Sequence, residues 1–522
     1  MNHHGYPLLP VGRAGSFLSG GPVGSQYDKP FRSLDEQVSI LERRGMDTGS
    51  PAEAKATLER ISYYRLSGYS YVFRSTDPVE VDTVTGRPVR LDEFEPGTTL
   101  GSVVRVMHFD KDVRSLLMAA IEVFEIALRA RVGHILGRYD PFSHRVPQFL
   151  GESFARTKLD EDGVETSDHQ RWLANFDHES ERSREQFVDH FRTNYDGVLP
   201  VWVATEVMSF GALALLVNGM RQADHQRLAI EFGFVGQDHM GDPGAFRGFL
   251  ENIRVLRNKC AHHARVWNAR MVAMTGVPHG VSELEHLSAE ATRERVYASF
   301  ALLAHVLAQL DPSDDWRARV RDVISSGLQR IGEPASRLGF PDDWDTLYLW
   351  DHHYIPSVDL AERVRRFAVL ADLPSGLPSD LHDHLPEPGP GNKRGDMLRR
   401  LRQRGLVLGL QVGQAYRYPG FQFDQSQVGP VEHIAGVTKA LFEQILGRPT
   451  RGVPSAELAD ASWAVAEWWT TPTFGQRPMH VLGKPNVSEI LREMLAVRGT
   501  APAGDAGAGI ASAMHPEVSS PS

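Results

Sequence analysis

The strongest constraint on the fold is a helical pattern that runs from Asp242 to Trp267. Asp242-Pro243 favours a helix start, because proline is well accommodated at the first helical position. At roughly 100° per residue, polar side chains gather on one flank around the small Ala261: Glu251, Arg254, Asn258, His262 and Arg265. Apolar residues recur at steps of three and four, which predicts a buried stripe beside that flank: Phe246, Phe249, Leu250, Ile253, Leu256, Cys260, Ala264 and Trp267.

Arg257 lies at the border between the flank and the stripe, and together with His262 it suits phosphate chemistry. An arginine stays charged and offers a fixed fork of donors to phosphate oxygens. A histidine can move protons near neutral pH, as removal of a proton from a 2′-hydroxyl requires. Asn258 lies one turn before His262 and could orient its ring or bind the sugar. Structural roles remain open, in which Arg257 forms an ion pair, His262 packs, and His263 and Cys260 have no chemical function.

The string from Arg257 to His262 resembles the R-x4-6-H motif of HEPN domains, many of which are metal-independent endoribonucleases. Its longer context, RNKCAHHARVWN, resembles the Abi-like (abortive infection) branch of that superfamily. Four further stretches resemble the same branch in the expected order: ISYYRLSGYSYVFR (61–74), FDKDVRSLLMAAIEVFEIALRARVGHILGRYDP (109–141), PVWVATEVMSFGAL (200–213) and LGFPDDWDTLYLW (338–350). The resemblance implies a HEPN-like helical bundle domain over residues 31–352.

The same resemblance implies roles for single residues. Arg257 would stabilise the charge that builds up on the phosphate, and His262 would act as the general acid and base. Glu206 would pair with an arginine of the motif helix or position His262, and a plain buried ion pair is an equal alternative. HEPN domains commonly pair so that two such motifs face one cleft. Because Arg257 and His262 lie about 140° apart on a helix, a partner copy could supply an arginine, and we expect a homodimer.

The tyrosine-rich stretch 63–69, YYRLSGY, admits two interpretations. Its rings and its arginine could stack on and bind nucleobases, or they could form a core layer beneath the motif helix. Around it, capping residues predict helices that open at Ser33 and Ser50, the second running into this stretch. Further patterns predict a hairpin within 75–97 and helices at about 99–137, 177–194, 285–311 and 313–330.

Composition narrows the classes of function. The chain has 522 residues, enough for two or three domains, and a net charge of −10. Any contact with nucleic acid must therefore come from local basic patches. A single cysteine excludes an internal disulfide framework and fits a reducing cytoplasm. No signal-peptide pattern is present, and the apolar stretches are too short to span a bilayer. We expect a cytoplasmic protein.

A second resemblance covers the C-terminal part. LRQRGLVLGLQVGQAYRYPGFQFD and WWTTPTFGQRPMHVLG (468–483) resemble MbcA/ParS/Xre-type antitoxin proteins. This implies an antitoxin-like domain at 395–497, mostly helical with a short β wing, that binds a toxin or nucleic acid. Residues 353–394 are expected to be a linker or a partial helix-turn-helix. Residues 1–30 are expected to form a flexible leader, and 498–522 a disordered tail.

A basic run precedes the wing and is either a nucleic-acid contact or a solvated basic helix. The candidate nucleic-acid-binding residues are therefore Arg254, Arg265, Lys393, Arg394, Arg399, Arg400, Arg402 and Arg404. The acidic and histidine-rich segment 342–353 lacks a recognised ligand spacing, so we predict no metal site. No cofactor is expected either.

These patterns together favour a mainly α protein that acts as a metal-independent endoribonuclease of phage-defence or toxin–antitoxin type. The expected partners are RNA, possibly DNA through the C-terminal module, a second copy of the chain, and an RNA or protein antitoxin. Two alternatives stay open. One is a HEPN protein that binds RNA without cleaving it, and the other is a DNA-binding regulator that acts through residues 355–495.

Overall fold

The computed structural model describes residues 30–81, 88–159, 163–236, 240–357, 359–373, 375–376, 381, 394–412, 415–423 and 429–498. The expected leader up to residue 29, the tail from 499 and much of the 353–394 segment lie outside these ranges. The chain divides into two compact units. The first comprises residues 1–220, 244–277 and 283–356, and the second comprises 221–243, 278–282 and 357–522.

Both units are mainly helical, which confirms the predicted fold class. The first unit contains helices α1 (Leu34–Arg43), α2 (Pro51–Ile61), α3 (Tyr63–Ser70), α4 (Leu100–Gly137), α5 (Glu152–Ala155), α6 (Asp168–Arg182), α7 (Gln186–Asn194), α8 (Val201–Val207), α9 (Phe210–Asn218), α11 (Pro243–Ala261), α12 (Glu290–Arg293), α13 (Tyr297–Leu310) and α14 (Trp316–Ile331). Its strands are β1 (Arg74–Val81), β2 (Pro88–Phe94), β3 (Lys158–Leu159) and β4 (Glu165–Thr166), paired as two antiparallel hairpins.

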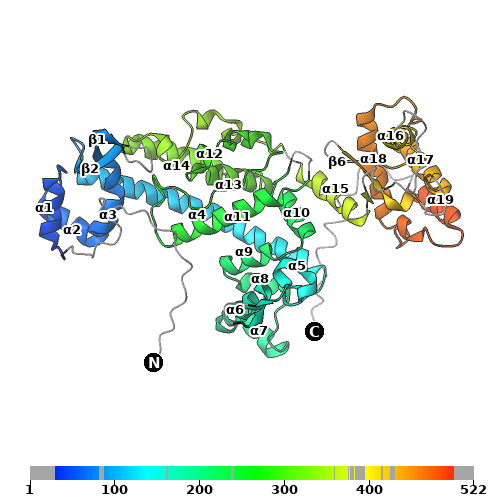
Figure 1. Ribbon diagram of the computed structural model, residues 1–522, viewed down its shortest axis with the longest axis horizontal. Coiled ribbons are helices and arrows are strands. Elements are labelled where there is room, and N and C mark those ends of the chain that lie inside the picture. The colour runs from blue at the N-terminus through cyan, green and yellow to red at the C-terminus, as the bar shows by residue number, and fades with distance from the viewer. Residues whose placement is uncertain are drawn as a thin grey trace, which may run out of the picture. The chain divides into compact units, whose positions relative to one another are not determined.

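Helix α4 is the centre of the first unit. It begins with a capping box in which Thr99 and Ser102 satisfy each other's backbone N–H groups. Helices α3, α8, α9, α13 and α14 all contact it, and Figure 1 shows α3 and the β1–β2 hairpin gathered near its start. Contact on several sides explains why α4 buries residues all around its axis instead of along one stripe.

Two helical glycines permit close packing against α4. A Cβ on Gly133 would lie 3.0 Å from the Cα of Trp202, so this glycine lets α8 approach α4. A Cβ on Gly327 of α14 would lie 2.2 Å from the ring of Phe109. Glycine within a helix costs about 1 kcal/mol relative to alanine. At both positions the close contact between helices accounts for that cost.

The N-terminal elements follow the predictions only in part. Ser33 forms the expected capping box with Glu36, and the hairpin and the long helix at 99–137 are confirmed. Ser50 precedes α2, but its side chain makes no capping hydrogen bond. The second helix also does not run into the tyrosine-rich stretch. Ser62, with φ of 72°, breaks it and caps the separate helix α3 through Arg65 N–H.

Two other helix predictions were wrong in their bounds. The segment predicted as one helix over 177–194 forms α6 and α7, and α6 begins at a capping box between Ser167 and Gln170. The segment predicted as one helix over 285–311 holds a 3-10 turn at Ser282–Leu287, then α12 and α13. Short non-helical stretches interrupt both segments, at residues 183–185 in the first and at 288–289 in the second.

The second unit contains helices α10 (Gln222–Glu231), α15 (Leu360–Asp372), α16 (Arg394–Gln403), α17 (Glu432–Leu446), α18 (Ser455–Thr470) and α19 (Val487–Arg498). Strands β5 (Ser375–Gly376), β6 (Leu410–Val412) and β7 (Ala415–Pro419) form an antiparallel sheet in the order β5-β7-β6, which confirms the short β wing. Helix α18 lies at the core of this unit, where α15, α17 and β6 contact it.

Within the described residues, no helix is both long and apolar enough to cross a membrane.

Candidate functional site

Helix α11 ends earlier than its apolar stripe predicted. The stripe is buried from Phe246 to Cys260, but the helix stops at Ala261 and Trp267 lies beyond it. Ala264 N–H donates to the Lys259 carbonyl at 2.8 Å. His263 N–H donates to the Cys260 carbonyl at 3.0 Å. These two bonds form a Schellman turn.

His262 and His263 are the two residues of that turn. His262 is the C-cap, and its N–H donates to the Asn258 carbonyl at 2.9 Å. His263 follows in the left-handed conformation with φ of 56°, a position that usually carries glycine. Both side chains are exposed, as is that of Asn258. The turn therefore presents His262 to solvent, where a ligand can reach it.

Two candidate arginines of α11, Arg254 and Arg257, are less accessible than predicted. Arg254 is held by Glu251 through two hydrogen bonds of 2.6 and 2.8 Å. Arg257 is half-buried, and its Nε is enclosed without a hydrogen-bond partner. Asn258 is one turn from His262 as expected, but its predicted contact with the ring is not among the hydrogen bonds of the described residues.

A buried carboxylate fixes the chain that follows the turn. Asp110 of α4 is fully buried and accepts hydrogen bonds from Trp267 N–H at 2.7 Å and Val266 N–H at 3.2 Å. It also accepts from the Tyr69 hydroxyl at 2.6 Å and from the Arg114 guanidinium. Burial and the nearby Asp110 raise the pKa of Tyr69 well above its usual range, so its hydroxyl stays a donor. Three separate stretches thus meet at one side chain.

Helix α3 reaches the turn directly. The Arg65 guanidinium donates through Nη2 to the His263 carbonyl. On the same helix Leu66, Tyr69 and Ser70 are buried, whereas Tyr64 is 83% exposed. The buried face confirms the core-layer interpretation, and the stacking of bases on the exposed ring of Tyr64 stays a prediction. The sequence suggested a nucleobase contact for Arg65, but it did not predict the hydrogen bond to the His263 carbonyl, which joins residues 198 positions apart.

Positive charge surrounds the turn. Burial lowers the pKa of Lys259, and the neighbouring Arg265 lowers it further. Arg265 donates to the Trp267 carbonyl at 2.9 Å, and burial lowers its pKa as well. Burial raises the pKa of the Cys260 thiol to about 12, which makes it a core residue instead of a nucleophile. The site thus combines an exposed histidine with cationic neighbours.

Glu206 does not join this cluster in the single chain. It is exposed on α8, and among the described residues no hydrogen bond or ion pair joins it to Arg254, Arg257 or His262. The carbonyls next to it, of Thr205 and Met208, accept instead from Arg129 of α4. Its expected role as a partner of the motif helix stays a prediction.

A known protein family resembles the part of the chain that contains this turn. Residues 56–268 match the family model of Abi-like proteins. The matched span contains α3, Asp110 and the whole turn after α11, and it ends one residue after Trp267. No curated protein and no solved structure matches the chain. Helix α3, Asp110 and the turn after α11 therefore all lie within the matched residues.

Outside the matched residues, one prediction for the basic run was wrong. Arg402 of α16 is 8% exposed, lies 3.3 Å from the centroid of the Tyr416 ring and donates to the Tyr418 hydroxyl at 3.2 Å. It is therefore part of the core beneath the β wing and is not available to nucleic acid. Arg399, Arg400 and Arg404 are exposed, and Arg399 pairs with Asp396 at 2.7 Å.

Lys393 lies outside the described residues, and Arg394 is described only as the first residue of α16. The described part of the chain contains no group of three histidine, cysteine, aspartate or glutamate side chains that could hold a metal ion.

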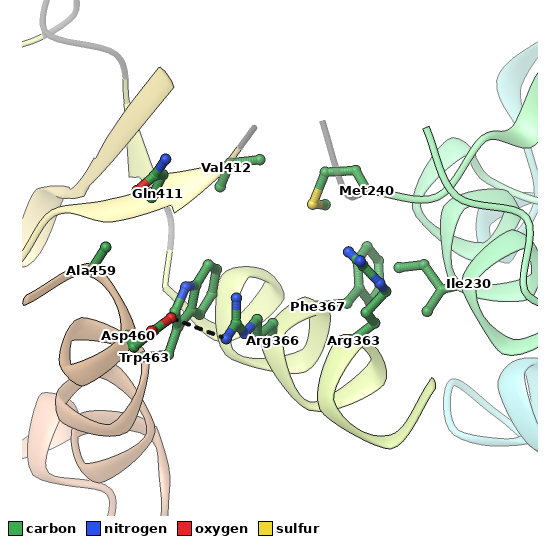
Figure 2. Close-up of a pocket in the computed structure, with 10 residues that line it drawn as sticks. All are labelled: Ile230, Met240, Arg363, Arg366, Phe367, Gln411, Val412, Ala459, Asp460 and Trp463. Atoms are coloured by element: carbon green, nitrogen blue, oxygen red, sulfur yellow. Dashed lines mark ion pairs between the residues drawn. The ribbon is translucent and has the colours of Figure 1, made fainter. Parts of the chain in front are cut away.

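The second unit contains a pocket of about 230 Å³ between α10, α15, α18 and β6. Figure 2 shows the side chains that line it, including Arg363, Arg366 and Trp463. The Arg366 guanidinium lies 5.2 Å from the Trp463 ring centroid and pairs with Glu362 and, at 3.7 Å, with Asp460. These carboxylates offset the charge of Arg366, and the ring of Trp463 gives the pocket one aromatic side.

Proposed function

We propose that this chain is a metal-independent endoribonuclease with a role in abortive infection. The observation that carries the proposal is the turn after α11. There His262 is exposed, Arg65 contacts the adjacent carbonyl, and Asp110 fixes the chain that follows. The match of residues 56–268 to Abi-like proteins supports the biological role.

The reaction needs a proton acceptor, a proton donor and positive charge. His262 takes the proton from a 2′-hydroxyl, whose oxygen attacks the adjacent phosphorus. The bond from phosphorus to the 5′-oxygen breaks, and that oxygen receives the proton back from His262, which now acts as the general acid. The products are a 2′,3′-cyclic phosphate and a 5′-hydroxyl. Arg257 stabilises the charge on the phosphate, Asn258 orients His262, and Arg254 and Arg265 contact the RNA backbone.

A homodimer belongs to this proposal. Because Arg257 and His262 lie about 140° apart on a helix, a second copy of the turn would supply its Arg257 to the phosphate held at His262. The exposed Asn258 and His262 leave this end of α11 open to such a partner. Glu206 would then act across the interface. Light scattering of the active protein checks the dimer, and a monomeric mass contradicts it.

The test of the activity uses the full-length chain and total bacterial RNA in EDTA. We expect cleavage by the wild type and a loss of about 10²- to 10⁴-fold in His262→Ala, the range that proton-transfer catalysis contributes. His352→Ala is the matched control, because His352 is exposed and far along the chain from the motif. A 3′-hydroxyl product, or cleavage that depends fully on magnesium, contradicts the mechanism.

A second function is favoured by one observation. Arg254 is already paired with Glu251 and Arg257 is half-buried, so the two motif arginines are not freely offered to a phosphate in the single chain. This arrangement suits a protein that binds RNA without cleaving it. Unchanged RNA affinity in His262→Ala, together with no cleavage by the wild type, favours that function.

The second unit is proposed to regulate or target the first. Its exposed Arg399, Arg400 and Arg404 could contact DNA or RNA, and an antitoxin-like role would restrain the nuclease. Salt-dependent binding to DNA that is lost on neutralising these three arginines supports a nucleic-acid role. Binding that persists in the triple variant contradicts it.

A further inference from the structure

Helix α3 has two faces with different surroundings. Leu66, Tyr69 and Ser70 form its buried face, at the spacing of one helical side. Tyr64 is two positions from Leu66 and therefore about 160° around the helix from it, and 83% of its surface is exposed. Single exposed aromatic residues are common, so exposure alone assigns no function to this ring.

The neighbour of Tyr64 gives the exposed face its location. Arg65 donates through Nη2 to the His263 carbonyl, one residue from His262. A guanidinium has five N–H donors, so this bond leaves donors for a further acceptor, and the Arg65 side chain is exposed. The contact places the start of α3 beside the exposed histidine.

We propose that Tyr64 and Arg65 form a subsite that binds single-stranded RNA beside His262. Arg65 binds a backbone phosphate next to the cleaved bond, and Tyr64 stacks on a base of an adjoining nucleotide. Aromatic rings next to arginine donors are the usual means of holding unpaired bases and their backbone. This inference rests on the proposed function, since it names how the RNA is held at the same turn.

A simpler role for Arg65 makes a different prediction. A cation at a helix C-terminus stabilises the helix through its dipole, and Arg65 is at that end of α11. This capping role predicts that substitutions of Arg65 change stability only. The proposed role predicts a change in how RNA binding depends on salt, because each phosphate contact releases counterions.

The experiment measures binding by the full-length chain of a single-stranded RNA that carries 2′-O-methyl riboses and 2-aminopurine. The methyl groups block attack by the 2′-oxygen, so binding is separated from cleavage. For Tyr64→Ala we expect about ten-fold weaker binding and loss of 2-aminopurine quenching, with an unchanged salt dependence. Tyr64→Trp should retain both signals.

For Arg65→Gln we expect weaker binding and a salt dependence that is less steep by about 0.7 in the log–log slope. Glutamine keeps an N–H donor for the His263 carbonyl, so its thermal midpoint should stay near that of the wild type. Phe31→Ala and Arg156→Ala are the matched controls, because both side chains are exposed elsewhere in the first unit. Neither should change binding.

The outcomes separate this inference from the proposed function. Wild-type binding by both Tyr64→Ala and Arg65→Gln overturns the inference, even if total RNA is cleaved. A change in stability for Arg65→Gln with an unchanged salt slope assigns Arg65 to capping and also overturns it. Binding with the expected slopes but no cleavage by the wild type supports the RNA-binding subsite and contradicts the proposed nuclease activity.

Discussion

The carboxylate of Asp110 accepts the Trp267 backbone N–H at 2.7 Å, across 157 positions of the sequence. Asp110 has no exposed surface, and its other donors are Tyr69, Arg114 and Val266. Hydrogen bonds to a buried charge are among the stronger ones, and each buried donor left without an acceptor would carry an uncompensated desolvation penalty of about 1–3 kcal/mol. This single residue therefore holds the chain after the His262 turn in place.

Asp110→Asn should destabilise the first unit by about 3 kcal/mol, since it leaves Arg114 as a buried charge without a carboxylate. It should also speed hydrogen exchange in residues 262–267, because the turn loses its anchor. Mass-resolved exchange of the full-length chain measures this. Asp112→Asn is the control, an aspartate on the same helix whose side chain is 48% exposed, and it should change stability by less than about 0.5 kcal/mol. Equal exchange in the two variants argues against an anchoring role.

His263→Gly should stabilise the turn by about 0.5–1 kcal/mol. His263 has φ of 56°, a conformation that costs a non-glycine residue about 1 kcal/mol and glycine almost nothing. The bond from Arg65 goes to the backbone carbonyl and is retained in this variant. Thermal unfolding compares it with His352→Gly, whose site lacks a positive φ and should be destabilised slightly. A lower midpoint for His263→Gly than for the control contradicts the strain at this position.

Helix α11 and Asp110 show which features of the site can be predicted from the sequence and which cannot. The buried stripe from Phe246 to Cys260 was predictable, because helical periodicity is a local property. The end of the helix was not predictable, because a Schellman turn usually has glycine in its left-handed position and here His263 occupies that position. Asp110 was also missed. An aspartate four residues before an arginine is typical of a solvated helix pair, and its decisive contacts come from residues far along the chain.

The buried ring of His144 should make the folded protein less stable at acidic pH. Its ring is buried against Trp172 and Phe176 without a hydrogen-bond partner for either nitrogen. Burial, with a smaller effect from Arg145, lowers the pKa of His144 to about 3. The unfolded chain binds this proton below about pH 6.5 and the folded chain does not, so stability falls as the pH drops from 6.5 towards 3.

His144→Met removes the titrating group and keeps an apolar side chain. Between pH 6.5 and 4, the free energy of unfolding of this variant should fall less steeply than that of the wild type, by up to about 1.4 kcal/mol per pH unit. The thermal midpoint, measured across this range, reports the difference. His352→Met, at an exposed histidine, should retain the slope of the wild type. Parallel curves for His144→Met and the wild type show that His144 is not the source of the pH dependence.

The arginines of the basic run should separate into structural and surface residues. Arg402 loses its contacts with the Tyr416 ring and the Tyr418 hydroxyl on substitution, so Arg402→Ala should cost the second unit about 2 kcal/mol. Arg404→Ala, at an exposed position of the same basic run, should change stability by less than about 0.5 kcal/mol. Urea unfolding measures both. If the second unit binds nucleic acid through its surface, Arg404→Ala weakens binding without unfolding, whereas Arg402→Ala weakens it only as far as the unit unfolds. Equal stability of the two variants contradicts the buried role of Arg402.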